Sequence, residues 1–554
     1  EVERQGYKIT FKDIDADYIE KLVEEGQLYL FQIYNKDFSP YSKGTPNLHT
    51  IYWKTLFSPD NLKDVVYKLN GQAEIFYRRK SIEEKDIICH PANEELRNKY
   101  PKAEKPTSKF PYELTKDRRF TVDKFQFHVP ITMNFKAKGE NYFNRKVRRL
   151  IHNCQDMHVI GIDRGERNLL YLTVIDMQGK IKEQLPLNDI VSTNKNEVVH
   201  HKDYHLLLEK REEENKAARQ DWQTINTIKE LKEGYLSQAI HIIAELMLKY
   251  NAIVVLEDLN FGFMRSRQKF EKQIYQKFER MLIDKLNYLV DKKRDINENG
   301  GALRAYQLTD KFESFQKLGK QSGFLFYVPA WNTSKIDPSS GFVNLFYTKY
   351  ETKEKTRDFI KKFDSIIYNE QENYFEFYFD YSNFTYKAEG SRTKWCLCTE
   401  GNRIETFRNP AKNAEWDTKE IILTEEFAGL LEKYHISWKS GEIKKAISEI
   451  EEAEFYRSFM HFMSLLLQMR NSDKKAGEDW LMSPVKNSRG EFFKTNKDSE
   501  DYPRDADANG AYNIAKKGLW IIEQIQKTEI DQLDKVKIAI SNKEWLAYAQ
   551  EHVL

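Results

Sequence analysis

Three short acidic stretches, far apart in the chain, have residue types that together could hold metal ions. They centre on Asp163, Glu257 and Asp507 and read HVIGIDRGER, AIVVLEDLN and DADANGAY. Each carboxylate ends an apolar strand or begins a helix, so all three can converge at one edge of a sheet. Two hard divalent cations held by such oxygens would activate a water and stabilise the leaving oxygen of a phosphodiester. We therefore predict a two-metal site built from these carboxylates.

The elements around the first acid are the most informative. Residues 157–162 are almost continuously apolar, which is typical of a strand buried on both faces. Residues 168–176 predict a second strand. The run Asp176-Met-Gln-Gly179 then predicts a hairpin turn into a third.

The other two acids also lie at element ends. Glu257 follows an apolar strand at 252–256, and a predicted helix at 235–250 precedes that strand. Asp507 opens a helix, whose N-terminus favours an ionised carboxylate. Any one of these acids alone reads as a cap or a solvated strand end. Three in this order favour the metal site, and the order resembles that of RNase H-like nucleases of the RuvC type.

A rival interpretation starts from the same first strand. Ile-Gly-Ile-Asp163 before a β-hairpin also resembles the opening of actin-like ATPases and sugar kinases, where the loop contacts nucleotide phosphates. Those folds need further glycine-rich loops. This chain has only 23 glycines, and no such loop follows residue 180. The kinase interpretation is therefore rejected.

Composition limits the remaining classes. A chain of 554 residues predicts three or four domains, and 40% hydrophobic residues are enough for real cores. No run of 18 apolar residues predicts a membrane span. The chain begins at Glu1 without a signal-like segment, so we expect it to be part of a longer protein. The pair Cys396 and Cys398 has no second Cys or His pair to complete a zinc site.

Charge is balanced overall and clustered locally. The net charge of +2 does not indicate a protein that coats DNA, but residues 145–149 and 265–269 are basic runs. We expect specific nucleic-acid grooves rather than a uniformly basic surface, with Arg265 and Arg267 among the contacts. A further amphipathic helix is predicted at residues 272–293.

Longer phrases resemble one family along the whole chain, the type V-A CRISPR effector nucleases (the Cas-twelve-a family). The phrases are LYLFQIYNKD from Leu28, PNLHTIYW from Pro46, KLNGQAEIFYR from Lys68, IGIDRGERNLLYLTVID from Ile160, EGYLSQ from Glu233, VVLEDLNFGF from Val254, LLLQMRNS from Leu465 and DADANGAY from Asp505. The resemblance implies a multi-domain α+β and α/β protein. Its split, RNase H-like RuvC domain would carry an inserted Nuc domain and follow a β-rich, OB-like wedge segment.

The same resemblance implies domain boundaries. These are 1–137 for the wedge segment, 138–201 for the first RuvC segment, 202–222 for a bridge helix, 223–329 for the second RuvC segment, 330–500 for the Nuc domain and 501–554 for the third RuvC segment.

The implied activity is RNA-guided DNA cleavage. The RuvC site would use two Mg²⁺ ions, with Mn²⁺ as a substitute, to hydrolyse the target and non-target strands. Once activated, it would also cut single-stranded DNA nonspecifically. The implied partners are guide RNA, target DNA and an N-terminal half that recognises the PAM and is absent from this sequence. No membrane is involved, and the implied location is the cytoplasm of a prokaryotic cell.

Residue roles follow from the resemblance. Asp163, Glu257 and Asp507 correspond to the catalytic, metal-binding triad. Arg470 corresponds to the Nuc-domain arginine that assists cleavage, with Asp479 near it. From the residues alone, Arg470 ends an apolar helix at 459–469 and reads as a helix cap. A guanidinium near the scissile phosphate would neutralise the charge of the transition state.

A second chemistry is implied upstream. His90, Lys99 and Lys116 correspond to residues that trim precursor guide RNA without metal, and which of them is acid or base stays open. His49 and Arg78 correspond to residues that hold the guide's repeat hairpin. In the polar stretch of residues 83–109, residue type alone predicts only solvated surface.

Trp222 stands alone on a helix dense in charge, at residues 202–233. It either packs on this chain's own nuclease core or, as the resemblance implies, inserts into a recognition domain.

Two other functions remain open. One is a guide-independent RNase H-like resolvase or transposase, and such enzymes lack a wedge domain. The other is an RNA-binding scaffold with a silent nuclease, which is hard to reconcile with an intact acidic triad.

Overall fold

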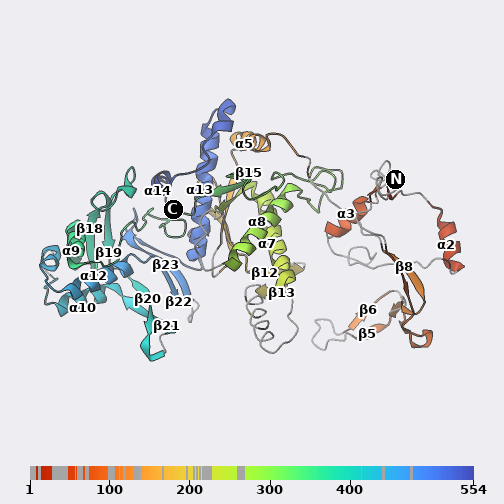
Figure 1. The fold of residues 1–554 in the computed structure, drawn as a ribbon, viewed down its shortest axis with the longest axis horizontal. Coiled ribbons are helices and arrows are strands. Elements are labelled where there is room, and N and C mark those ends of the chain that lie inside the picture. The colour runs from red at the N-terminus through yellow and green to blue at the C-terminus, as the bar shows by residue number, and fades with distance from the viewer. Residues whose placement is uncertain are drawn as a thin grey trace. The chain divides into compact units, whose positions relative to one another are not determined.

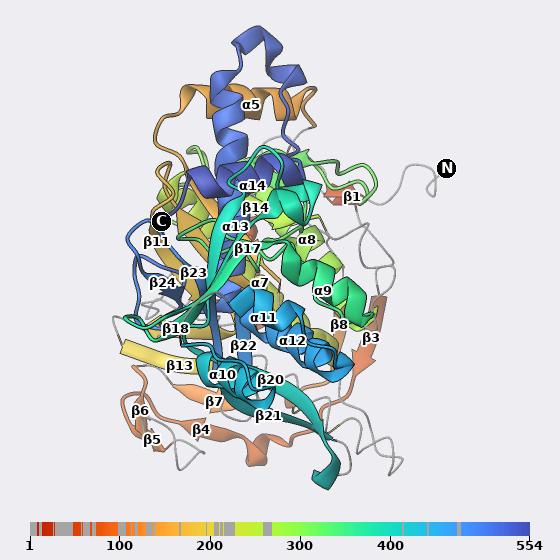
Figure 2. The same ribbon diagram turned by 90° about the vertical axis from the view of Figure 1, so that its left-hand side faces the viewer.

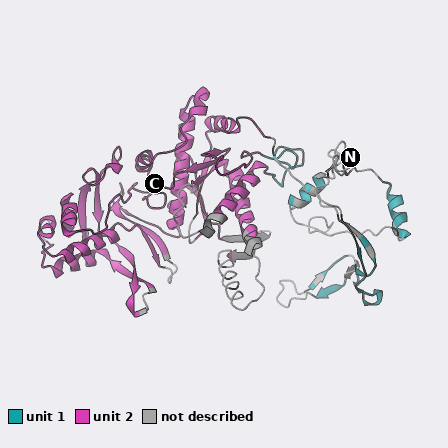
Figure 3. Ribbon diagram, viewed as in Figure 1, with its two compact units in different colours: residues 1–137, 290–306 teal, residues 138–289, 307–554 magenta. Residues whose placement is uncertain are grey.

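The computed structural model describes most of the chain as two compact units. Unit one is residues 1–137 with 290–306, and unit two is residues 138–289 with 307–554 (Figure 3). No helix of the described residues is both long and apolar enough to cross a membrane. The segments outside the description are 1–7, 10–13, 26, 28–47, 57, 59–66, 69–73, 98–106, 112, 117–119, 129–136, 138, 165–167, 195–196, 204–205, 207–209, 211–213, 215–227, 259–268, 413–414, 440–442 and 474–477.

The described residues of the first unit form short antiparallel strand pairs and two α-helices. Strands β1–β2, β3–β8, β4–β7 and β5–β6 pair, and no closed barrel forms among its described residues. The OB-like wedge therefore stays a prediction. The elements are β1 (Lys8–Ile9), α2 (Ala16–Glu24), α3 (Leu48–Leu56), β2 (Tyr67–Lys68), β3 (Glu74–Arg78), β4 (Ile88–His90), β5 (Glu95–Arg97), β6 (Thr107–Lys109), β7 (Leu114–Lys116) and β8 (Lys124–His128).

The second unit is built on a mixed six-stranded sheet in the order β11-β10-β9-β14-β16-β15. Strand β9 pairs antiparallel with β10 and parallel with β14, and β14 pairs parallel with β16. The predicted turn forms, since the amide of Gly179 donates to the carbonyl of Asp176 at 3.0 Å. The strands are β9 (His158–Asp163), β10 (Tyr171–Ile175), β11 (Ile181–Pro186), β14 (Ala252–Glu257), β15 (Gln321–Ser322) and β16 (Leu325–Val328).

Helices cover both faces of this sheet. Helix α13 (Ala506–Lys527) lies on one face, and α7 (Ile228–Tyr250) and α8 (Lys269–Asn287) lie on the other (Figures 1 and 2). Helix α7 contains the helix predicted at 235–250. It continues through Gly234, where the sequence predicted that the charged helix at 202–233 ends and this second helix begins. Helix α8 ends at Asn287, earlier than predicted. Other elements here are α5 (Phe143–Asn153), β12 (Asp189–Asn194), β13 (Glu197–Asp203) and α14 (Asn542–Glu551).

Small residues allow α13 to approach the sheet very closely. A β-carbon at Gly161 of β9 would overlap the carbonyl oxygen of Ala511 and the amide of Ala515 on the helix. A β-carbon at Gly518 would overlap Val255 of β14. A larger side chain at either glycine would push the helix away from the sheet.

The insertion between β16 and α13 has an aromatic core. Phe346, Phe363, Phe379 and Phe384 contact one another, with ring centroids 4.8 to 6.1 Å apart. This cluster accounts for part of the chain's 13% aromatic residues. The elements are α9 (Lys353–Lys361), β17 (Phe363–Asn369), β18 (Tyr374–Asp380), β19 (Lys394–Cys398), β20 (Asn402–Asn409), β21 (Glu415–Ile422), α10 (Leu423–Lys433), α11 (Ile443–Ser448), α12 (Ala453–Leu466), β22 (Arg470–Asp473), β23 (Glu478–Lys486) and β24 (Phe492–Lys494).

Helix α13 is buried along most of its length, including two lysines. The ammonium of Lys517 donates to the carbonyls of Pro329 at 2.6 Å and Trp331 at 3.0 Å. The ammonium of Lys516 lies 3.4 Å from the carbonyl of Ala549. Burial lowers the pKa of each lysine to about 7.

The close helix–sheet contact predicts that Gly161→Ala is destabilising. The added methyl group should lower the free energy of unfolding by about 1–3 kcal/mol, because the atoms it meets are backbone. Gly429→Ala is the matched control, since Gly429 lies in α10 with open space around it. That change should raise helix stability by about 0.5–1 kcal/mol. Denaturant unfolding measures both, and equal effects would contradict the close contact.

The buried ammonium of Lys516 predicts a pH-dependent stability. Between its folded pKa of about 7 and the ordinary value of 10.5, the unfolded chain binds a proton that the folded chain does not. The free energy of unfolding therefore rises with pH in this window, by up to about 1.4 kcal/mol per pH unit. Lys516→Met should be more stable than wild type near pH 7, with an advantage that shrinks as pH rises. Denaturant unfolding at several pH values tests this, with exposed Lys527→Met as the control. A constant difference would contradict it.

Candidate active site

Two of the predicted acids meet because their strands are neighbours. Asp163 ends β9 and Glu257 ends β14, which run parallel with Leu256 opposite Ile162. The two carboxylates therefore leave the same edge of the sheet from adjacent positions. Glu257 is 8% exposed, so this edge is largely buried.

Helix α13 brings the third acid to the same edge. Its N-cap is Asp505, whose carboxylate accepts from the amide of Ala508 at 2.8 Å, and Asp507 lies in the first turn. A β-carbon at Gly510 would overlap the carboxylate of Asp163, so the helix lies directly against that side chain. The sequence prediction that Asp507 opens a helix is confirmed.

Each acid is held by a hydrogen-bond donor. Asp507 Oδ2 accepts from the side chain of Asn168 at 2.8 Å and from its amide at 3.3 Å. Glu257 Oε1 accepts from the hydroxyl of Thr333 at 2.5 Å. Asp163 Oδ1 accepts from the amide of Arg164 at 2.9 Å. These bonds fix the orientation of all three carboxylates.

The acids repel one another electrostatically. Burial, followed by the charges of Glu257 and Asp507, raises the pKa of Asp163 well above its usual range. The nearby guanidinium of Arg470 acts in the opposite direction. A site with this much negative charge favours a cation.

Arg470 supplies a cation from the insertion. Its guanidinium binds both oxygens of Asp479 at 3.1 and 2.7 Å, and Nη2 lies 3.2 Å from Asp507 Oδ1. Burial opposes the charge, but the carboxylates of Asp479, Asp507 and Asp163 outweigh it and raise the pKa of Arg470. The structure thus joins Arg470, Asp479 and Asp507.

The prediction that Arg470 ends a helix is wrong. Helix α12 ends at Leu466, and Arg470 begins strand β22, where it pairs with Leu481 of β23. The apolar sequence up to Met469 continues beyond the helix because Met469 is buried in the core. Since Arg470 is a strand residue, the helix-cap role is excluded.

Two further basic side chains, Arg164 and Lys517, bind backbone carbonyls at or near the strand ends. The buried guanidinium of Arg164 pairs with Glu279 of α8 and donates to the carbonyl of Glu257. Lys517 holds the loop after β16 through the carbonyls described above, and Thr333 lies at the end of that loop. Arg164 therefore positions Glu257 through the backbone carbonyl of that residue. Lys517 positions it through the loop that carries Thr333, whose hydroxyl donates to the Glu257 carboxylate.

Sequence reasoning missed four of these residues. Arg164 stands inside the first acidic stretch and Asn168 directly follows it, and their closeness to Asp163 was the signal that could have found them. Thr333 and Lys517 belong to no motif. Only the folded chain brings Thr333 to Glu257 and Lys517 to the carbonyls of Pro329 and Trp331.

The predicted RNA-trimming residues lie in the first unit or outside the described residues. His90 ends β4, and its Nε2 lies 3.2 Å from the carbonyl of Glu94. Lys116 ends β7 opposite Ile88 of β4, so its backbone is on the strand next to His90. Lys99 lies outside the described residues. Their joint role stays a prediction.

The remaining predicted contacts are only partly described. The guanidinium of Arg78 lies 4.1 Å from the ring centroid of Phe120, and His49 lies in α3. Arg265, Arg267 and Trp222 lie outside the described residues. Their roles as nucleic-acid or interdomain contacts stay predictions.

The basic run at 145–149 is partly occupied by intramolecular contacts. Arg145 pairs with Asp534 at 3.3 Å, and Arg148 donates to the carbonyl of Leu533 at 2.9 Å. These two arginines contact residues 533 and 534 from α5. The expected nucleic-acid groove at this run stays a prediction.

The chemistry of the acidic edge fits divalent cations. Asp163, Glu257 and Asp507 would offer only oxygen ligands, as Mg²⁺ and Mn²⁺ prefer. In the described residues, however, no group of three or more His, Cys, Asp or Glu side chains is arranged to hold a metal ion. In this arrangement Asp507 contacts Asn168 and Arg470, and Glu257 contacts Thr333.

Comparison with known families covers this whole region. A sequence model described as the RuvC nuclease domain matches residues 137–554. The match includes the sheet, the three acids, α13 and the insertion that carries Arg470.

Proposed function

The chain belongs to the RuvC nuclease family, and from that premise we propose that it is the nuclease part of a type V-A CRISPR RNA-guided DNA endonuclease. Family membership supports nucleic-acid cleavage and agrees with the mixed α/β sheet of an RNase H-like nuclease. That a guide RNA directs this cleavage is the further step that we propose. It is supported by the phrases that resemble the type V-A effectors throughout the chain.

One structural observation carries the proposal furthest. The insertion between the second and third acids contributes Arg470, which contacts Asp507. An insertion with an arginine at the acids is what a Nuc domain inserted into a RuvC domain requires. A simple resolvase-like nuclease has no need of this element.

The three acids would hold the metal ions. RuvC nucleases are generally dependent on divalent metals, and we propose two Mg²⁺ ions, with Mn²⁺ able to substitute. When bound, such ions supply an activated water and stabilise the leaving oxygen. Asn168 and Thr333 orient Asp507 and Glu257 through the hydrogen bonds described above. Arg470 provides positive charge where the transition state gains negative charge.

We further propose the family's wider activity. The acids would cut the target and non-target strands, and afterwards single-stranded DNA without sequence preference. The partners would be guide RNA, target DNA and an N-terminal half that reads the PAM, with Trp222 inserting into it. His90, Lys99 and Lys116 would trim precursor guide RNA without metal, by acid–base attack of a ribose 2′-hydroxyl. His49, Arg78, Arg265 and Arg267 would contact nucleic acid.

Two substitutions should separate the two activities. Asp163→Ala removes a metal ligand and should abolish DNA cleavage, while precursor guide RNA is still trimmed. His90→Ala should stop or slow trimming and leave DNA cleavage intact. Both assays use the chain together with the N-terminal half and guide RNA. Loss of RNA trimming in Asp163→Ala would show that the two-site assignment is wrong.

Arg470→Ala should slow DNA cleavage about a hundredfold, because a contact to the developing charge is worth on the order of 3 kcal/mol. Arg457→Ala is the matched control, since Arg457 is an exposed arginine of the same insertion. Single-turnover cleavage rates measure the effect, and thermal unfolding checks that the fold is kept. Equal rates in the two variants would return Arg470 to a purely structural role.

A further inference from the structure

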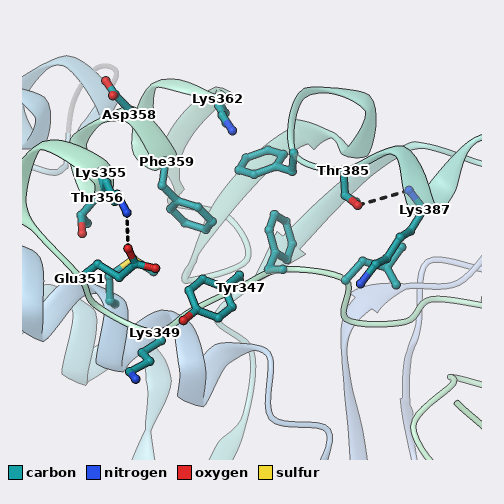
Figure 4. A pocket seen from close by; sticks show the side chains of 14 residues that line it. Tyr347, Lys349, Glu351, Lys355, Thr356, Asp358, Phe359, Lys362, Thr385 and Lys387 are labelled. Carbon is teal, nitrogen blue, oxygen red and sulfur yellow. Dashed lines mark hydrogen bonds and ion pairs between the residues drawn. The ribbon is translucent and has the colours of Figure 1, made fainter. Parts of the chain in front are cut away.

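A hollow with an aromatic floor lies in the insertion, formed by residues 345–351, helix α9 and residues 384–387 (Figure 4). Its volume is about 440 Å³, which is the size of a small-ligand pocket. Phe346, Phe359 and Phe384 contact one another edge to face at its base, with centroids 4.8 to 5.8 Å apart. Tyr347 is 64% exposed and lies in the middle of the hollow.

Lysines surround this aromatic floor. Lys349, Lys362 and Lys387 line the hollow from three different segments, and all three are exposed. Among the described residues, no carboxylate lies within ion-pair distance of any of them. Lys362 does lie 5.7 Å from the centroid of Phe384.

The two carboxylates of the lining are already paired. Glu351 forms an ion pair with Lys355, and Asp358 forms one with Lys361 at 3.6 Å. The lining has more lysines than carboxylates, so the hollow has a net positive charge next to the exposed ring of Tyr347.

We propose that this hollow binds a single-stranded segment of the nucleic acid that the enzyme cuts. Bases stack on aromatic side chains, and ammonium groups contact the phosphates between them, a combination suited to single strands. Tyr347 would take a base, and Lys349, Lys362 and Lys387 would take phosphates. This rests on the proposal that the substrate is DNA.

A duplex fits the hollow poorly. Its bases are stacked on one another, so their faces are not available to Tyr347. Duplex DNA would meet only the lysines. Preference for a single strand is therefore the property that distinguishes this hollow from a general basic surface.

The test measures binding of a fluorescein-labelled oligothymidylate to the full chain by fluorescence anisotropy, in EDTA so that no cleavage occurs. The first variant, called the rim variant, is the triple change Lys349→Gln, Lys362→Gln and Lys387→Gln. The second is Tyr347→Ala. The control is Lys419→Gln, Lys439→Gln and Lys445→Gln, which removes the same charge from exposed lysines of the insertion that do not line the hollow.

The rim variant should bind more weakly, and its slope of log affinity against log salt should fall by about 2, since each phosphate contact on a single strand contributes about 0.7. Tyr347→Ala should weaken binding at least about fivefold. The control should bind as wild type does, and unlabelled duplex should compete less well than single strand.

The possible failures are distinguishable. Unchanged binding in the rim variant or in Tyr347→Ala, with wild type binding the oligonucleotide, overturns the hollow as the site and leaves the proposed nuclease function intact. If the control variant loses as much affinity as the rim variant, the effect comes from general positive charge. This result also overturns the hollow as the binding site. No binding by wild type or control overturns both the hollow and the proposed DNA substrate.

Discussion

The contact between α13 and β9 is the constraint on which the acidic site depends. Gly161 leaves room for the backbone of the helix, and Gly510 leaves room for the carboxylate of Asp163. Only at this separation can Asp507 in the first turn of the helix reach the edge where Asp163 and Glu257 end. Packing free energy over the length of α13 thus offsets the cost of bringing three like charges together.

The neighbouring basic residues differ in how directly they balance the negative charge of the three acids. Arg164 and Lys517, two basic residues near the strand ends, have other partners, since Arg164 pairs with Glu279 and Lys517 donates to backbone carbonyls. Among the described residues, Arg470 is the cationic side chain that contacts one of the three acids directly. The insertion therefore completes the electrostatics of a site whose three acids all come from outside it.

The sequence predicted the parts of the site whose signals are local. Strand ends and the start of α13 follow from apolar runs beside single acids, so the positions of Asp163, Glu257 and Asp507 at element ends could be predicted from residue pattern alone. Thr333 could not, because its role arises only when the loop after β16 lies beside β14. Arg470 was placed on a helix because burial of Met469 prolongs the apolar pattern past the end of α12. Periodicity reports burial, and burial does not distinguish a helix from the strand that follows it.

The position of Arg470 also links the insertion's fold to the acids. Its fork-like contact with Asp479 requires β22 and β23 to pair in register, with Ser472 opposite Asp479 and donating to it at 2.6 Å. A register shift of one residue would turn Asp479 to the other face of the hairpin and leave Arg470 without its second anchor. Asp507 alone would then hold the guanidinium, through one bond at 3.2 Å instead of three. The position of the Arg470 guanidinium beside the acids is thus fixed by strand pairing in the insertion. In the same way, the positions of the acids are fixed by strand pairing and helix packing in the sheet.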